Sequence, residues 1–215
     1  MAGLPPHRSG TTTLAIVRPR LIADDVLLDA VLCAFANLGY EGTSIRAVAR
    51  EIGISHNTIN NRFGSKDKLW YSAVDHGFAQ LADVLAIEAS AESGDPLTQL
   101  HMAAQRFVDY SAANPALLRI VIHEASLPGP RFEHMYHSFI KPTQDAAARV
   151  ITDLQARGRL RSGPLSPAFF FLVTMGLGSL AGLTDLLARF SDDRTDPSAI
   201  ARLAVDIVFD GFTAT

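Results

Sequence analysis

Two short helices separated by a glycine are the feature of this sequence that most constrains its fold. Apolar residues at spacing i, i+3, i+4 and i+7 predict the first helix, and Gly53 is placed to end it. Ser55 can cap the second helix. The inward-facing residues are Ile45, Val48, Ala49 and Ile52 in the first helix, and Ile59 and Phe63 in the second. Such a pair forms a helix-turn-helix over residues 44–63, a unit that presents its second helix to a DNA groove.

The outer face of the second helix carries small polar and basic side chains. Its exposed positions are predicted to be His56, Asn57, Thr58, Asn60, Asn61 and Arg62. Asn can pair with adenine, and Arg can pair with guanine, through two hydrogen bonds each. Hydroxyls and backbone amides at helix N-termini suit phosphates, so Ser44, Ser55 and the turn at Ser65–Lys66 are candidate phosphate contacts. The alternative interpretation, from spacing alone, is a plain three-helix packing unit with a polar face.

Charge is distributed unevenly along the 215 residues, although the formal net charge is only −3. Residues 1–70 hold eight basic and six acidic side chains, a balance of +2, which leaves −5 for the remainder. This asymmetry is weak, but it has the direction that DNA binding needs. Apolar residues make up 48% of the chain and charged residues 19%, which predicts a globular protein rather than a disordered one.

Nearly every periodic segment predicts a helix, and no alternating segment bounded by turns predicts a strand. The expected fold class is all-α, with about nine helices: an N-terminal three-helix DNA-binding domain and a larger C-terminal helical domain. Later helices are expected at residues 97–113, 115–126, 132–157, 166–190 and from 197 onward, with a kink near Pro142. Cys33 falls in an apolar helical pattern, so it is expected to be buried.

Residues 21–81 resemble the N-terminal domain of tetracycline-repressor-type (TetR family) regulators. The resemblance rests on F-x-x-x-G-Y at Phe35–Tyr40, T-S-I-x-x-V-A-x-E-x-G-I-S at Thr43–Ser55 and F-x-S-K-x-x-L at Phe63–Leu69. It implies a flexible arm at residues 1–20, a DNA-binding domain at 21–81 and an effector-binding and dimerisation domain at 82–215. It also implies a homodimer that binds a palindromic operator in double-stranded DNA and is released by a small-molecule effector.

The resemblance also assigns DNA contacts to residues of this chain. The family's phosphate contacts fall on Thr43 or Ser44, on Ser55 and on Lys66, and its base contacts fall among His56, Asn57, Thr58 and Asn61. Arg46 belongs to the same predicted surface. The chain departs from the family pattern at Asn60 and Arg62, where aromatic residues are common. A tyrosine hydroxyl is therefore absent at Asn60, whereas Arg62 supplies charge attraction to DNA.

The segment Ser162–Thr184 carries no charged side chain, and its 23 residues are enough to span a bilayer. Gly163, Pro164 and Pro167 break its first turn, which favours a buried or interface helix over a membrane span. Because a large apolar surface on a soluble protein needs a partner, the last two long helices are predicted to form a dimer interface; a core helix of a monomer is the alternative. The predicted interface residues are Phe170, Val173, Leu177, Gly178, Gly182, Leu203 and Ile207.

A ligand cavity is predicted among the middle helices. Its candidate lining residues are Phe78, Leu81, Met102, Gln105, Phe107, Tyr110, Ile120, His123, Met135, Tyr136, Phe139 and Thr174. An apolar lining with a few polar anchors is typical of ligand pockets, so the predicted effector is largely apolar. Ordinary core packing is the alternative for each of these residues.

Other functions have weaker support in the sequence. His134 and His137 are three residues apart and can share a helix face, but no cysteine lies nearby and Glu133 is the only adjacent carboxylate. No phosphate-binding loop follows a strand and no G-x-S-x-G turn is present, so we expect no catalytic residues, metal or cofactor. A regulator that acts as an activator, or through a protein partner without a small ligand, is the remaining alternative. The N-terminus lacks the apolar core of a secretory signal, and a cytoplasmic protein without membrane contact is expected.

Overall fold

The computed structural model describes residues 23–86, 94–127, 129–162, 166–183, 186, 189 and 196–213. Regular secondary structure in these residues is helical, and one isolated antiparallel bridge joins Leu160 to Thr213. The predicted all-α fold class is confirmed. The arm predicted at residues 1–20 lies outside the described residues, as does most of the segment that would extend the helix from 166 to 190.

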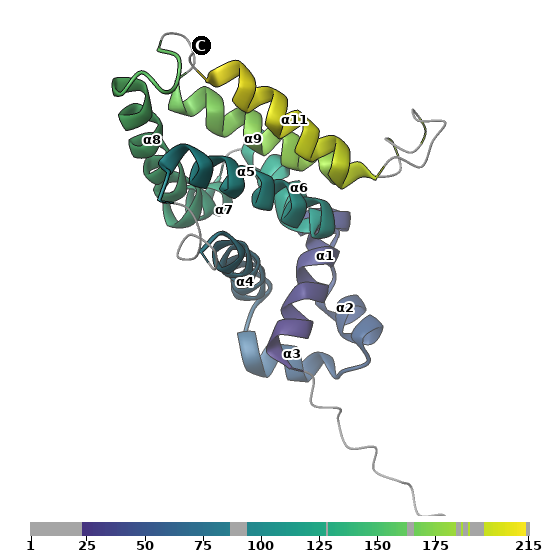
Figure 1. Ribbon diagram of the computed structural model, residues 1–215. Helices are drawn as coiled ribbons and strands as arrows, with labels where there is room; N and C mark the ends of the chain where they lie inside the picture. The colour runs from purple at the N-terminus through teal and green to yellow at the C-terminus, as the bar shows by residue number, and fades with distance from the viewer. Residues whose placement is uncertain are drawn as a thin grey trace, which may run out of the picture.

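The helices follow one another along the chain as Figure 1 shows. Their bounds are α1 Asp24–Gly42, α2 Ile45–Ile52, α3 His56–Phe63, α4 Lys66–Ala86, α5 Pro96–Ala113, α6 Pro115–Ser126, α7 Pro130–Met135, the π-helix η1 Tyr136–Ile140, α8 Lys141–Ala156, α9 Pro167–Ala181 and α11 Pro197–Phe212. In Figure 1 the helices α1 to α3 occupy the lower part of the molecule, and α9 and α11 lie side by side along its upper edge.

The N-terminal helices share a core that continues into the middle of the chain. Leu27, Val31 and Phe35 of α1 pack with Ile59 of α3 and Trp70 of α4, and all five are almost fully buried. The same cluster includes side chains from α6 and from α7, namely Leu117, Ile120, Val121 and Met135. Apolar side chains from both sides of residue 81 therefore pack in a single core. The domain boundary at that residue stays a prediction.

A second core joins α5, α8, α9 and α11. Phe170 of α9 lies at its centre, with ring-centroid distances of 5.3 Å to Phe209 and 5.6 Å to Phe212. Ile151 and Leu154 of α8 close the cluster from the other side. Phe170 is thus buried within its own chain, so it does not belong to the surface that the sequence assigned to a dimer interface.

The long helix predicted at residues 132–157 is present as one continuous run, α7–η1–α8, that begins at Pro130. The irregularity predicted near Pro142 takes the form of the π-helical turn η1, in which the Lys141 N–H bonds to the Tyr136 carbonyl. Proline lacks an N–H and its ring crowds the carbonyl four residues earlier. A wider π turn just before Pro142 accommodates both effects without ending the helix.

Gly178 and Gly182 of α9 approach helices of the same chain. A Cβ atom on Gly178 would lie 2.7 Å from Phe107 Cε1 of α5 and 3.1 Å from Leu118 Cδ1 of α6. A Cβ atom on Gly182 would lie 2.9 Å from Pro115 Cβ. The two glycines do mark a close helix contact, and its partners are α5 and α6. Gly178 is buried by this contact and leaves the predicted dimer interface, whereas the assignment of the half-buried Gly182 stays a prediction.

We expect Gly178→Ala to lower the free energy of unfolding by about 1–3 kcal/mol, because the added methyl group overpacks a filled contact. Urea unfolding followed by circular dichroism measures the change. Gly211→Ala is the matched control, since a Cβ there meets no atom within 4 Å. The control should be neutral or slightly stabilising, by up to about 1 kcal/mol. An unchanged stability of Gly178→Ala would show that α5 and α9 are not in this contact.

Cys33 differs from its prediction, because its side chain is exposed on α1 rather than buried. The apolar stripe of α1 that enters the core is formed by Leu27, Val31, Leu32 and Phe35. Cys33 lies next to that stripe on the helix surface, and its position in an apolar run did not reveal which side it faces.

Candidate DNA-binding surface and ligand cavity

The turn between α2 and α3 is fixed by backbone hydrogen bonds. Gly53 has the left-handed backbone (φ 79°, ψ 28°), and its N–H donates to the Arg50 carbonyl at 3.2 Å. The Ile54 N–H reaches back to the Ala49 carbonyl at 2.9 Å. This pair of bonds is the Schellman arrangement, which favours glycine at the left-handed position. Gly53 thus turns the chain sharply enough to set α3 against α2.

The first turns of both helices are capped by serine. The Ser44 hydroxyl accepts a bond from the Ala47 N–H at 3.4 Å, and the Ser55 hydroxyl accepts one from the Asn57 N–H at 3.2 Å. Both serines are exposed. The caps hold the helix N-termini, with their partial positive charge, at the surface of the helix-turn-helix.

Helix α3 separates its apolar side from its polar side. Ile59 is 1% exposed and anchors α3 in the core, whereas Asn57 and Asn61 are exposed and four residues apart. The Asn60 amide lies 2.9 Å from His56 Nε2, so these two half-buried side chains bond to each other. Asn57 and Asn61 are therefore the outermost amides of the predicted reading helix.

The remaining predicted DNA contacts occupy different environments. Arg46 and Ser44 are exposed on α2, and Thr58 is half-buried on α3. Arg62 forms an ion pair with Asp24 of α1 at 2.7 Å. Thr43 is 4% exposed and its hydroxyl donates to the Gly39 carbonyl at 2.7 Å. Of the two alternatives Thr43 and Ser44, the structure thus leaves only the Ser44 side chain at the surface.

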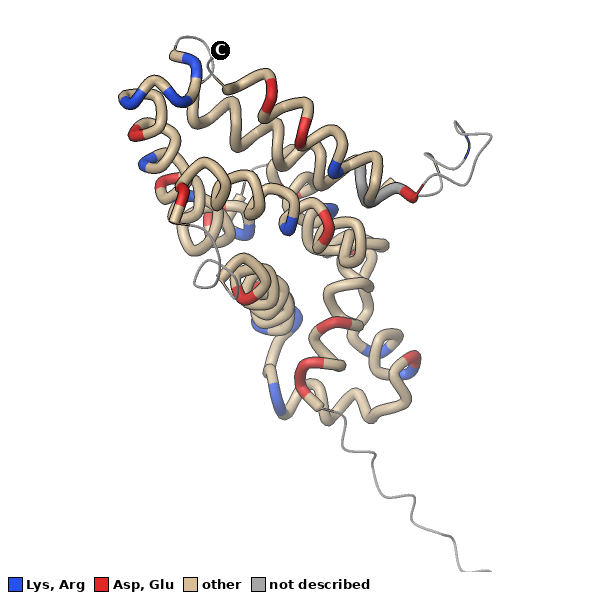
Figure 2. The backbone as a smooth tube through the Cα atoms, viewed as in Figure 1, with Lys and Arg blue, Asp and Glu red and all other residues tan. Residues whose placement is uncertain are grey.

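Lys66 begins α4 beside an aromatic ring of α1. Its Nζ lies 4.4 Å from the Tyr40 ring centroid and donates to the Glu41 carbonyl at 3.4 Å. The Tyr40 hydroxyl donates to Asp67 Oδ1 at 2.5 Å. Burial of the phenol, together with this hydrogen bond, raises the pKa of Tyr40 to about 12, so the ring stays neutral. Figure 2 shows basic and acidic positions interspersed along the backbone in this lower part of the molecule.

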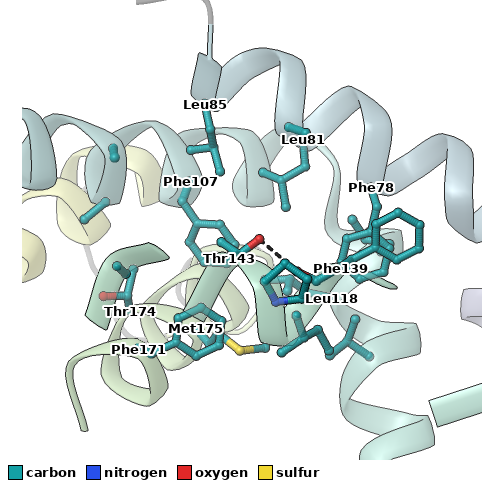
Figure 3. Close-up of a pocket in the computed structure, with 18 of the residues that line it drawn as sticks. Phe78, Leu81, Leu85, Phe107, Leu118, Phe139, Thr143, Phe171, Thr174 and Met175 are labelled. Carbon is teal, nitrogen blue, oxygen red and sulfur yellow. Dashed lines mark hydrogen bonds between the residues drawn. The ribbon is translucent and has the colours of Figure 1, made fainter. Parts of the chain in front are cut away.

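An apolar cavity of about 340 Å³ lies among α4, α5, α6, the η1–α8 run and α9. Figure 3 shows its aromatic walls, with Phe78 and Phe139 stacked at a centroid distance of 4.4 Å. The full lining is Phe78, Leu81, Ala82, Leu85, Leu100, Ala103, Ala104, Phe107, Leu117, Leu118, Val121, Ser138, Phe139, Ile140, Pro142, Thr143, Ala147, Phe170, Phe171, Thr174 and Met175. None of these side chains is charged.

The cavity contains part of the lining predicted from the sequence. Phe78, Leu81, Phe107, Phe139 and Thr174 are present, whereas Met102, Gln105, Tyr110, Ile120, His123, Met135 and Tyr136 are not among its lining residues. Several of the absent residues have other roles: Gln105 bonds Asp206 at 2.9 Å, Tyr110 bonds Gln80 at 3.1 Å, and Met135 is buried in the first core. Sequence reasoning missed large lining residues such as Leu118, Phe171 and Met175, and also small ones such as Ala103 and Ala147, whose size leaves the space open.

The histidines considered as metal ligands bind separate carboxylates. His134 Nε2 lies 2.6 Å from Asp75 of α4, and His137 lies 3.2 Å from Glu133. Across the part of the chain that the structure describes, no three His, Cys, Asp or Glu side chains converge as metal ligands would. No described helix is long and apolar enough to cross a bilayer.

One face of α9 and α11 leaves large apolar side chains exposed. Leu172 is 68% exposed, Leu203 59% and Ile207 62%. Phe169 and Leu180 continue the exposed series along α9, and Leu183 follows just beyond its end. Two of the predicted interface residues, Leu203 and Ile207, lie on this face, while Val173 and Leu177 are half-buried. Leu172 was missed because its charge-free surroundings gave no sign of which side faces outward.

Residues 27–70 match the family described as bacterial regulatory proteins of the tetR family. Among relatives, the HTH-type transcriptional regulator BetI of Burkholderia thailandensis is 26% identical over 160 residues, which cover 64% of this chain and 82% of the relative. BetI of Burkholderia ambifaria is 28% identical over 163 residues, which cover 65% of this chain and 83% of that protein.

The fold is shared with solved structures of low sequence identity. A tetR-family regulatory protein from Rhodococcus RHA1 superposes with a TM-score of 0.69 at 19% identity, covering 91% of this chain and 100% of that one. The ketosteroid transcriptional regulator KstR2 of Mycobacterium tuberculosis superposes with a TM-score of 0.68 at 17% identity, covering 93% and 100%. Residues 27–70 thus carry the sequence pattern of the tetR family of bacterial regulators, and the chain has the fold of the solved structures that it resembles. The relatives that match this chain are transcriptional regulators, which are not enzymes.

Proposed function

We propose that the protein is a homodimeric repressor that binds a palindromic operator and is released when a small, uncharged and largely apolar molecule fills its cavity. The main support for this proposal is that a single helix, α4, contributes residues both to the DNA-binding surface and to the wall of the cavity. Helix α4 begins with Lys66 beside the helix-turn-helix, and three of its later residues, Phe78, Leu81 and Leu85, line the cavity. A molecule that moves this wall acts on the helix that enters the DNA-binding surface.

The proposed dimer places the exposed faces of α9 and α11 against those of a second copy. Leu172, Leu203 and Ile207 would be removed from water there, which is the favourable term in most protein association. A two-fold symmetric pair would present two α3 helices to successive half-sites of a palindrome. In this arrangement Asn57, Asn61 and Thr58 face the bases, and Ser44, Arg46, Ser55 and Lys66 face phosphates.

The cavity lining argues for an uncharged effector. A charge moved from water into an apolar site without a partner loses several kcal/mol of solvation. The hydroxyls of Thr143 and Thr174 donate to the carbonyls of Phe139 and Phe170, at 2.8 and 2.9 Å. Their oxygens keep free lone pairs, so a hydroxyl group on the effector can donate to them. Liquid water takes roughly 30 Å³ per molecule, which gives this cavity space for about a dozen non-hydrogen atoms.

We expect 1-decanol to raise the melting temperature, while decanoate and decyltrimethylammonium leave it nearly unchanged. A ligand present at about 100 times its Kd stabilises by about 2.7 kcal/mol, or roughly 5–10 °C for a chain of this size. Ala103→Phe is the matched control, because its side chain would fill the cavity and remove the effect of decanol. Equal stabilisation by a charged compound would contradict the uncharged-effector proposal.

Release from DNA needs a separate measurement with an operator selected from random duplex DNA. Filling the cavity, by a bound compound or by Ala103→Phe, should weaken operator binding. If compounds stabilise the protein but never change its affinity for the selected DNA, the alternative is favoured: an activator, or a regulator controlled by a protein partner. We also propose that the protein is cytoplasmic and that its domain boundary lies near residue 81.

A further inference from the structure

We propose that Arg131 is a positioning residue that transmits the state of the cavity to the DNA-binding surface through its contact with Tyr40. This inference rests on the proposed function and names the contact through which the two parts of the chain act on each other.

Arg131 joins four helices through one guanidinium group. Its Nε donates to Glu124 Oε1 of α6 at 3.1 Å. Its Cζ lies 4.1 Å from the Tyr40 ring centroid and 5.8 Å from that of Trp70. Arg131 itself belongs to α7, Tyr40 lies near the C-terminal end of α1, and Trp70 lies in the first turns of α4. The side chain thus sits where the C-terminal helices meet the start of the DNA-binding unit.

Both helices that hold this ion pair also form walls of the cavity. Val121 lines the cavity one turn before Glu124 on α6. Phe139 lines it on the continuous helical run that begins with α7 and carries Arg131. A molecule that displaces these walls therefore displaces the Arg131–Glu124 pair that joins them.

Tyr40 connects Arg131 to the residues that are proposed to bind phosphates. The Tyr40 ring that contacts Arg131 also contacts Lys66, whose Nζ lies 4.4 Å from the centroid of the Tyr40 ring. Ser44, which caps α2, follows Tyr40 by four residues. The ring is neutral, and its hydroxyl donates a hydrogen bond to Asp67. Because Arg131 and Lys66 both contact this ring, a change in the position of one cation affects the other.

The relative strengths of the Arg131–Glu124 ion pair and the Arg131–Tyr40 stacking decide which of the two contacts changes when the cavity is filled. Glu124 is 5% exposed, and a buried carboxylate left without its guanidinium partner is strongly unfavourable. The stacking of Arg131 on Tyr40 involves a side chain that is 30% exposed, and it is the weaker of the two interactions. Helices α6 and α7 therefore move as a pair, and the contact with Tyr40 is the one that shifts.

A double-mutant cycle on the full-length protein tests this inference. Ala103→Phe serves as the probe for an occupied cavity, and Arg131→Ala removes the proposed contact. Affinity for the selected operator is measured for the wild type, both single variants and the double variant. We expect Ala103→Phe to weaken operator binding at least about five-fold more in the wild type than in the Arg131→Ala background. Additive effects would overturn the inference, because a purely structural role of Arg131 gives additive losses.

A second measurement follows the geometry directly. Cys33 is the only cysteine and is exposed on α1, so one spin label per chain reports the distance between the two DNA-binding units of a dimer. Burial of part of the thiol and the nearby Asp29 raise the pKa of Cys33, so labelling needs a mildly alkaline solution. We expect Ala103→Phe to shift this distance in the wild type and to shift it by less than half as much in Arg131→Ala.

Variants of Tyr40 supply the matched control. Tyr40→Leu removes the ring but leaves the Arg131–Glu124 pair, and should reduce coupling as Arg131→Ala does. Tyr40→Phe keeps the ring and loses only the bond to Asp67, so coupling should persist. Equal coupling in Tyr40→Leu and Tyr40→Phe would overturn the inference while the proposed function stands. If no distance between protomers is observed, the proposed dimer fails, and the affinity cycle alone decides the role of Arg131.

Discussion

Glutamate in place of both Leu172 and Ile207 will convert the protein from a dimer to a monomer. These side chains are 68% and 62% exposed, on the face that we propose meets a second copy. Carboxylates at these positions would have to lose their hydration without a partner when the dimer forms, which is strongly unfavourable. Light scattering coupled to size-exclusion chromatography measures the change in mass.

The same variant should lose most of its affinity for the operator. Two reading heads held in one dimer gain about 100-fold or more over a single head, and a monomer forfeits that gain. Ile122→Glu is the control, because Ile122 is also an exposed apolar residue but lies on α6 rather than on α9 or α11. A double variant that remains a dimer at low micromolar concentration would show that another surface pairs the chains.

Alanine in place of Asn57 or Asn61 will weaken binding to the selected operator while leaving binding to unrelated DNA nearly unchanged. A side-chain amide that makes two hydrogen bonds to adenine contributes about 1–3 kcal/mol of discrimination, or roughly 5- to 150-fold. Both residues lie on the outer side of α3, which the serine cap and the buried Ile59 hold in place. Fluorescence anisotropy with operator and scrambled duplexes measures the difference.

Two further variants distinguish a loss of base contacts from a general loss of DNA binding. Lys66→Ala should weaken binding to both duplexes and reduce the slope of log affinity against log salt by about 1, because a phosphate contact releases counterions regardless of sequence. Asn37→Ala, on α1, loses an exposed hydrogen bond from Arg119 of α6 and should bind like the wild type. If the Asn57 and Asn61 variants lose affinity equally for both duplexes, α3 does not read bases through these amides.

The agreement between sequence and structure is closest where the physical cause is local. The helix-turn-helix follows from a serine cap, a glycine that adopts a left-handed backbone and an apolar pair four residues apart. Each of these signals acts within a few residues, so α2 and α3 lie within the predicted span. The proline-induced irregularity at residue 142 was predicted for the same reason, although its form as a π turn depended on the surrounding packing.

Contacts between distant segments were harder to predict. The small residues of α9 indicated a close helix contact, but nothing in their spacing distinguishes α5 of the same chain from a second copy. The cavity lining was predicted in part, because apolar side chains that fill a core and those that border a space have the same pattern. Arg131 drew no attention in the sequence, since its partners Glu124, Tyr40 and Trp70 meet it only in the folded chain.

The sequence by itself determined that this protein is helical and contains a helix-turn-helix, because hydrophobic periodicity and helix caps act over a few residues. The tertiary structure decided which faces meet inside the chain and which remain exposed. It assigned Gly178 to an internal contact, left Leu172 and Ile207 at the surface, and brought Arg131 onto Tyr40. Those outcomes depend on the joint packing of α4 to α11, in which each helix excludes alternatives for its neighbours, and no single segment contains that information.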